Sequence, residues 1–112
     1  MHRKLKRIYM KRTEIVKQIS QALHRSHPNA EVILYGSEAR GDARQDSDID
    51  VLVLLPQENL TIADRRGVSD VLYPIELAYD TVISTIVELK DKWEQRIMTP
   101  FKYNVLREGI QL

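Results

Sequence analysis

The chain has 112 residues, a formal net charge of +1 and no cysteine. This length suits one domain over residues 1–112, and 43% hydrophobic against 29% charged residues allows a buried core. The composition excludes disulfides and thiolate metal sites, it gives no general attraction to nucleic acid, and no apolar run reaches the roughly 20 residues of a membrane span. We therefore expect a cytoplasmic domain without membrane contact.

The first segment, to about His24, is predicted to be an amphipathic helix, because its apolar residues recur at three- and four-residue spacing. Pro28 restricts the residue before it and should end this helix. Basic residues in the first twelve positions interrupt any apolar signal segment. They form either a nucleic-acid patch or a solvated helix face, and we favour the second because only Tyr9 accompanies them as a stacking aromatic. These basic residues are Arg3, Lys4, Lys6, Arg7, Lys11 and Arg12.

The next segments read as two strands, at residues 31–35 and 49–55. The second is an apolar run that a sheet would bury on both faces, yet Asp48 and Asp50 lie at its start. Side chains at positions i and i+2 of a strand point to the same face. Two neighbouring carboxylates in an apolar strand need a counter-charge, and ligands that are all oxygen favour Mg²⁺ or Mn²⁺. The alternative, a polar turn that ends at Ser47 and Asp48, does not account for Asp50.

Between these strands lies a turn that suits phosphate. Gly36 has no β-carbon and lets a ligand approach the backbone closely. Ser37 is expected to cap a short helix over residues 38–40, whose end would offer free N–H groups to a phosphate. Arg40 either contacts phosphate or pairs with a nearby aspartate. A phosphate-binding turn followed by two metal-binding carboxylates is the arrangement of metal-assisted phosphoryl or nucleotidyl transfer.

The rest of the chain continues the alternation of helix and strand. A capping box at residues 61–64 should open a helix that runs to about Tyr79 and bends near Pro74. Residues 81–88 are rich in β-branched side chains and predict a third strand. Helices are expected at residues 90–96 and from Pro100 to Gly109. The predicted fold class is therefore α/β, a small mixed sheet of three or four strands with helices packed on one side.

The residues Gly36-Ser37, Ala39-Arg40-Gly41 and Ser47-Asp48-Ile49-Asp50-Val51 together resemble the signature of the DNA polymerase beta-like nucleotidyltransferases. In particular they resemble the minimal nucleotidyltransferase domains of that superfamily. The resemblance implies transfer of a nucleoside monophosphate from a nucleoside triphosphate, ATP being expected, to a hydroxyl group. It assigns Asp48 and Asp50 to the metal and to catalysis, and it assigns Gly36, Ser37 and Arg40 to the nucleotide.

Members of this family usually carry a third acidic residue on the next strand. Its expected place falls near Ser84 or Thr85, neither of which is acidic. Asp80, before the strand, is our first candidate for the missing catalytic carboxylate, and Glu88, at the end of the strand, is the second. Two functions follow from this ambiguity. The chain is either an active enzyme that acts with a helical partner protein, as antitoxin-like members do, or a degenerate domain that binds such a partner without chemistry.

Overall fold

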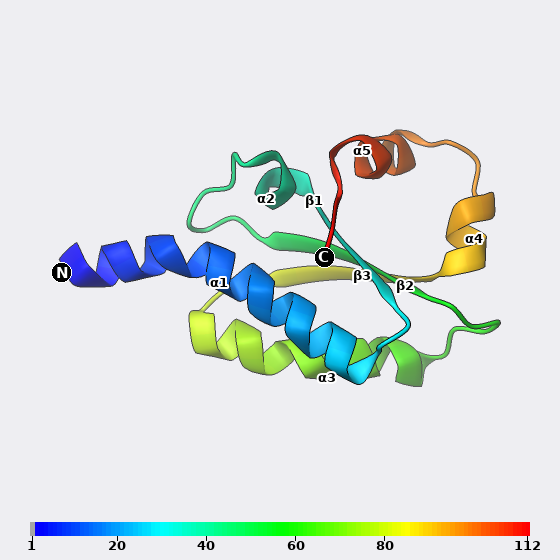
Figure 1. Cartoon of the computed structure of the whole chain (residues 1–112), viewed down its shortest axis with the longest axis horizontal. Coiled ribbons are helices and arrows are strands. Elements are labelled where there is room, and N and C mark those ends of the chain that lie inside the picture. The colour runs from blue at the N-terminus through cyan, green and yellow to red at the C-terminus, as the bar shows by residue number, and fades with distance from the viewer. Residues whose placement is uncertain (1) are drawn as a thin grey trace.

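The computed structural model describes the backbone of residues 2–112 and the side chains of residues 12–112. Helices and strands alternate along most of the chain, and Figure 1 shows their arrangement. In chain order they are α1 (His2–Ser26), β1 (Glu31–Tyr35), α2 (Gly36–Arg40), β2 (Ile49–Leu55), α3 (Ile62–Tyr79), β3 (Ile83–Leu89), α4 (Lys90–Gln95), α5 (Pro100–Glu108) and β4 (Ile110–Gln111).

The four strands form one mixed sheet in the order β3-β2-β1-β4. Strand β2 is antiparallel to β1 and parallel to β3, and β4 is antiparallel to β1. The register places Asp50 of β2 between Tyr35 of β1 and Ser84 of β3. This row of three residues defines the end of the sheet at which the two aspartates lie.

The long helices α1 and α3 cover one face of the sheet (Figure 1), so the prediction of helices on one side holds for these two. The apolar stripes of both helices meet alternate residues of the strands, which is the packing expected when strand side chains point to opposite faces. The fully buried centre of this core comprises Ile19, Leu23, Val32, Ile49, Val51, Val53 and Val68.

The opposite face of the sheet is partly covered by α4 and α5, so helices lie on both sides and not only on one. Trp93 of α4 and Val105 of α5 pack against Leu52 and Leu54 of β2. Phe101 connects this second cluster to the aspartate end, because its ring lies 5.4 Å from the ring of Tyr35 and 6.0 Å from that of Trp93.

Strand β3 lies at one edge of the sheet, and helix α3 covers part of its free side. The carbonyl of Val82 accepts a hydrogen bond from the N–H of Ile49 in β2. Backbone groups alternate in a parallel ladder, so the N–H and C=O groups of Ile83, Thr85 and Val87 point away from β2. The Ile83 N–H donates to Glu76 Oε2 at 2.9 Å. The Val87 carbonyl accepts from Arg65 at 3.2 Å. Side chains of α3 thus hydrogen-bond to backbone groups that would otherwise remain open.

Several predicted boundaries agree with the structure and others shift. The capping box at Thr61 and Asp64 opens α3, as the sequence predicted. Helix α1 continues two residues past His24, and β3 begins at Ile83 because Asp80 and the residues after it still belong to the end of α3 and a turn. The two-residue strand β4 was not predicted individually. No helix among the described residues is long and apolar enough to cross a membrane.

Candidate active site

Two aspartates mark the start of β2. Asp48 precedes the strand and is exposed, whereas Asp50 is its second residue and is partly buried. Asp50 lies on the face of Leu52 and Leu54, opposite to the buried Ile49 and Val51. Burial and then the charge of Asp48 raise the pKa of Asp50, while the charge of Arg40 lowers it by a smaller amount. The structure therefore brings the two predicted metal ligands together in a site where a cation would relieve their repulsion.

Gly36 lies directly against the Asp50 carboxylate. Its φ angle is 74°, in the left-handed region that favours glycine, and a β-carbon built there would overlap with Asp50 Oδ2 and lie 3.2 Å from Asp50 Cγ. We expected the missing β-carbon to make room for a phosphate. In the structure the space beside the Gly36 α-carbon is taken by the Asp50 carboxylate. Any side chain at position 36 would therefore displace that carboxylate.

Ser37 does not cap the short helix, contrary to the prediction. Helix α2 begins at Gly36, so Ser37 lies in its first turn, and Tyr35 at the cap position makes no side-chain hydrogen bond to the helix. The Ser37 carbonyl accepts from the backbone N–H groups of Gly41 and Asp42, at 3.0 and 3.1 Å. The helix starts early because Gly36 adopts the conformation that turns the chain directly out of β1. A role for Ser37 in binding phosphate stays a prediction.

Arg40 makes two ion pairs at the surface. Its Nε lies 3.3 Å from an oxygen of Asp42, and a terminal nitrogen lies 3.2 Å from Glu108 of α5. Both alternatives that the sequence left open therefore remain compatible with its position, since it pairs with an aspartate and its charge is still felt at Asp50. Its role at a nucleotide stays a prediction.

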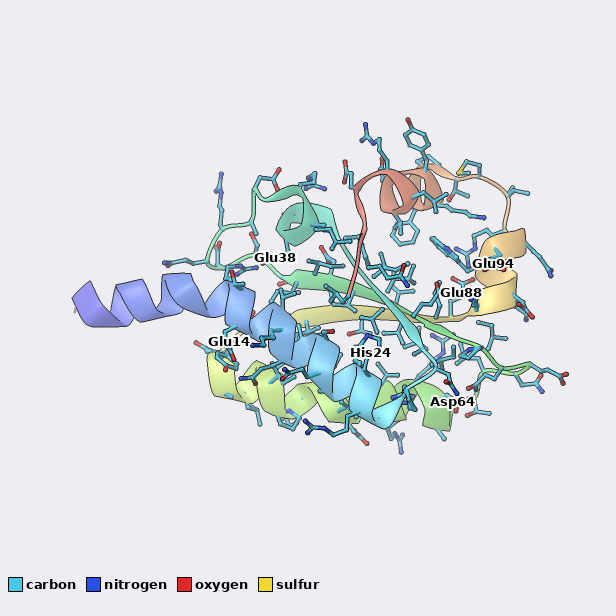
Figure 2. The ribbon with its side chains drawn as sticks, viewed as in Figure 1. Glu14, His24, Glu38, Asp64, Glu88 and Glu94 are labelled. Carbon is cyan, nitrogen blue, oxygen red and sulfur yellow. The ribbon has the colours of Figure 1, made fainter. Side chains whose placement is uncertain are left out.

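The sequence reasoning missed Arg12, which we placed on a solvated helix face. Its side chain is only 13% exposed and pairs with Glu38 of α2 at 2.6 Å. It also donates to the carbonyls of Gln45 and Ser47, both at 3.0 Å. Glu38 lies over α1 in Figure 2. One guanidinium thus fastens α1 to both α2 and the loop that leads into Asp48. The other five basic residues of the predicted face lie outside the residues whose side chains are described.

We expect Arg12→Lys to loosen the loop before Asp48. A lysine ammonium is a point charge and cannot span three partners, whereas the planar guanidinium does. Hydrogen bonds from charged groups contribute about 1.5–3 kcal/mol each, and 1 kcal/mol shifts the midpoint of thermal unfolding by roughly 4 °C in a domain of this size. The loss of one bond should therefore lower that midpoint by roughly 6–12 °C. Hydrogen exchange at residues 42–47 should accelerate. Arg25→Lys, at an exposed position of the same helix, is the matched control, and an equal effect of both changes would contradict the role of Arg12.

Strand β3 carries a serine where a third carboxylate would stand beside Asp50. Ser84 is the register partner of Asp50, and Glu88 pairs with Leu54, four positions further along. Glu88 also forms an ion pair with Arg96. Asp80 ends α3 in a left-handed conformation with φ 49° and is exposed. Within the described part of the chain, no three acidic, histidine or cysteine side chains cluster as ligands of one metal ion. A catalytic role for Asp80 stays a prediction.

Comparisons with known proteins identify the family of the chain. The model of the family described as "Nucleotidyltransferase domain" matches residues 16–108. A protein of Methanocaldococcus jannaschii named "Putative protein adenylyltransferase MJ0604" is 38% identical over 78 residues, which cover 70% of this chain and 72% of that protein.

Two solved structures share the fold. A structure from Sulfolobus solfataricus described as "a putative nucleotidyltransferase" has a TM-score of 0.62 at 22% identity, and the match covers 94% of this chain and 82% of that one. A structure described as a toxin-antitoxin with AMP-PNP has a TM-score of 0.60 at 22% identity, with 85% and 69% covered. The family match extends over the Gly36 turn, the aspartate pair, helix α3 and the part of α1 from residue 16 on, and this chain therefore belongs to the nucleotidyltransferase domain family.

Proposed function

We propose that this protein is a metal-dependent protein adenylyltransferase, which transfers AMP from ATP to a hydroxyl group of a protein. The observation that carries the proposal is the contact between the Gly36 turn and the Asp50 carboxylate at the start of β2. This contact places the backbone of the Gly36 turn directly beside two same-face carboxylates. The relative from M. jannaschii is named as a protein adenylyltransferase, which supports a protein as the acceptor.

The donor set fits a divalent cation. Asp48 and Asp50 offer only oxygen atoms, as Mg²⁺ and Mn²⁺ prefer, and their mutual repulsion favours a bound positive charge. A bound divalent ion would neutralise phosphate charge and polarise the reacting groups. The chain itself would orient the triphosphate through the backbone of Gly36 and Ser37, with Arg40 close enough to contribute charge.

The proposed reaction exchanges one phosphorus–oxygen bond for another. The acceptor hydroxyl oxygen forms a bond to the α-phosphorus of ATP, and the bond from that phosphorus to the oxygen that bridges to the β-phosphate breaks. Pyrophosphate leaves, and the hydroxyl proton passes to solvent or to a neighbouring carboxylate. Attacking and leaving oxygens lie roughly in line across the phosphorus, so they occupy opposite sides of it. A hydroxyl held in this line reacts much faster than one that is free in solution.

A second function, a binding module without chemistry, is favoured by one observation. The register partner of Asp50 is Ser84, so the position beside the aspartate pair lacks a third carboxylate. Such a domain would keep the fold and would bind a helical partner protein. The solved structure with AMP-PNP is that of a toxin-antitoxin, which supports both a nucleotide and a protein partner for this fold.

Incubation with α-labelled ATP and Mg²⁺, with and without a helical partner protein, separates the two functions. We expect label to transfer to protein, and we expect Asp80→Asn to lower the rate by roughly tenfold to a hundredfold while the affinity for a non-hydrolysable triphosphate stays unchanged. Glu88→Gln is the control, because Glu88 pairs with Arg96 and lies at the level of Leu54. Transfer that is equal in both variants would remove Asp80 from catalysis, and no transfer from the wild type would favour the binding module.

A further inference from the structure

A cavity of about 630 Å³ lies on the same face of the sheet as Asp50, beyond the predicted active site. Five apolar residues are among those that line it, and Ile86 and Phe101 are two of them. Three cationic residues, Arg65, Lys92 and Arg96, and two acidic ones, Glu58 and Glu88, also line it. The strand register gives the distance of the cavity from the two aspartates. Ser84 is the register partner of Asp50, and Ile86 and Glu88 lie two and four residues further along β3. At about 3.3 Å per residue these positions are roughly 7 and 13 Å from the aspartate level.

Phe101 lies between the cavity that it lines and the aspartate end of the sheet. The ring of Phe101 contacts that of Tyr35, and Tyr35 is the register partner of Asp50 on the other side of β2. Figure 2 shows Glu88 between the sheet and helix α4, at the cavity end of β3. The cavity and the aspartate end thus lie on one face of the sheet, about two to four residues apart along β3.

The cationic side chains of the cavity differ in how they are held. Arg65 donates to the Val87 carbonyl, and Arg96 pairs with Glu88. Lys92 is exposed and has neither a hydrogen bond nor an ion pair with any of the described side chains. Glu58 also lines the cavity, so its three cations exceed its two carboxylates by one charge. The unpaired Lys92 above an apolar floor suits a side chain that carries a carboxylate.

The topology of the sheet indicates which reactant reaches this cavity. The Gly36 turn follows β1, on one side of β2, and the cavity lies over β3, on the other side. In an in-line displacement the acceptor approaches opposite to the leaving pyrophosphate. Because the phosphates are expected at the β1 side, the acceptor comes from the β3 side. An extended peptide rises about 3.3 Å per residue, so a residue two to four positions from the reacting hydroxyl reaches the cavity.

We propose that this cavity binds an acidic side chain of the acceptor protein, two to four residues from the hydroxyl that receives AMP. The inference rests on the proposed function, and it names a sequence preference of the acceptor that the family match does not supply. Lys92 binds the carboxylate, and Ile86 with Phe101 packs against the aliphatic part of the side chain.

The test uses pairs of synthetic peptides that carry one serine, threonine or tyrosine and either glutamate or lysine at the positions two to four residues away. Binding is measured by fluorescence anisotropy in the presence of a non-hydrolysable ATP analogue and Mn²⁺, and transfer is measured with α-labelled ATP. We expect the glutamate peptide to bind roughly five- to tenfold more tightly at low salt, and the preference to weaken as salt rises. Lys92→Glu should remove or reverse it, and Lys17→Glu, on the exposed surface of α1, should not.

Each outcome separates this inference from the proposed function. Transfer without a charge preference overturns the inference and leaves the adenylyltransferase standing. Charge-selective binding without transfer supports the cavity and overturns the enzyme. If Lys92→Glu weakens binding of the ATP analogue and leaves the peptide preference intact, the cavity holds part of the nucleotide and the inference is wrong. An absence of both selective binding and transfer overturns both proposals.

Discussion

Replacing Asp48 and Asp50 together by asparagine should abolish Mn²⁺-dependent binding of a non-hydrolysable ATP analogue and lower AMP transfer by roughly a hundredfold or more. A bound divalent cation supplies several kcal/mol of stabilisation to developing charge, and each 1.36 kcal/mol is a factor of ten in rate. Neutral amides are poor ligands for a hard cation compared with carboxylates. Titration calorimetry measures binding of the ATP analogue, and incorporation of label from α-labelled ATP into protein measures AMP transfer.

The matched control is Asp46→Asn, an exposed aspartate of the same loop. It removes one charge two residues from Asp48 and should leave binding and transfer unchanged. Equal binding of the triphosphate by the wild type and the double variant would remove the metal site from this protein, whatever the transfer assay gives.

The same double variant should be more stable than the wild type when no metal is present. The pKa of Asp50 is raised in the folded protein by burial and by Asp48, so the folded state binds its proton more tightly than the unfolded state does. The stability associated with Asp50 is therefore fully present below its unfolded pKa and is lost as pH rises through its folded pKa. Urea unfolding should show the gain of the double variant at pH 7 and not at pH 3. A gain of the same size at both pH values would mean that charge is not its cause.

Gly36→Ala should weaken triphosphate binding by roughly tenfold or more, because the new β-carbon displaces the Asp50 carboxylate. The overlap falls on Asp50 Oδ2, one of the atoms expected to ligate the metal. The left-handed backbone at φ 74° adds a strain of about 1–2 kcal/mol for any residue with a β-carbon. Titration calorimetry with Mn²⁺ and the ATP analogue measures the loss of affinity, and urea unfolding measures the strain.

Gly41 offers a control that separates these two effects. Its φ angle is 83°, so an alanine there carries the same strain, but its β-carbon would meet no atom within 4 Å. Gly41→Ala should lose a similar amount of stability and keep its affinity for the triphosphate. If both variants lose affinity equally, backbone strain and not the Asp50 contact would explain the result.

The sequence predicts those parts of the site that depend only on residues close to one another in the chain. The pairing of Asp48 with Asp50 follows from the two-residue period of a strand, and the turn at Gly36 follows from the absence of a β-carbon. The contact between Gly36 and Asp50 was not predictable in this way, because it depends on the register of β1 against β2. Neither the turn nor the strand determines that register alone.

The role of Arg12 was hidden for a different reason. Its partners Glu38, Gln45 and Ser47 are 26, 33 and 35 residues away in sequence. In sequence Arg12 belongs to a row of basic residues, and nothing in their spacing distinguishes it from its neighbours. The contacts of Arg12 depend on where α1 lies against the sheet. Tertiary packing decides that position, and the helical periodicity of the sequence does not.

The hydrogen bonds from α3 to the rim of β3 also affect how the protein behaves at high concentration. An open strand edge is a template on which a second chain can add, and this is a common route to aggregation. Glu76 occupies the Ile83 N–H and Arg65 occupies the Val87 carbonyl, so the two ends of the outward row are already satisfied. An incoming strand would have to displace both side chains before it formed a continuous ladder past Thr85. Helix α3, which covers the core, thereby also opposes the pairing of a second chain with the edge of β3.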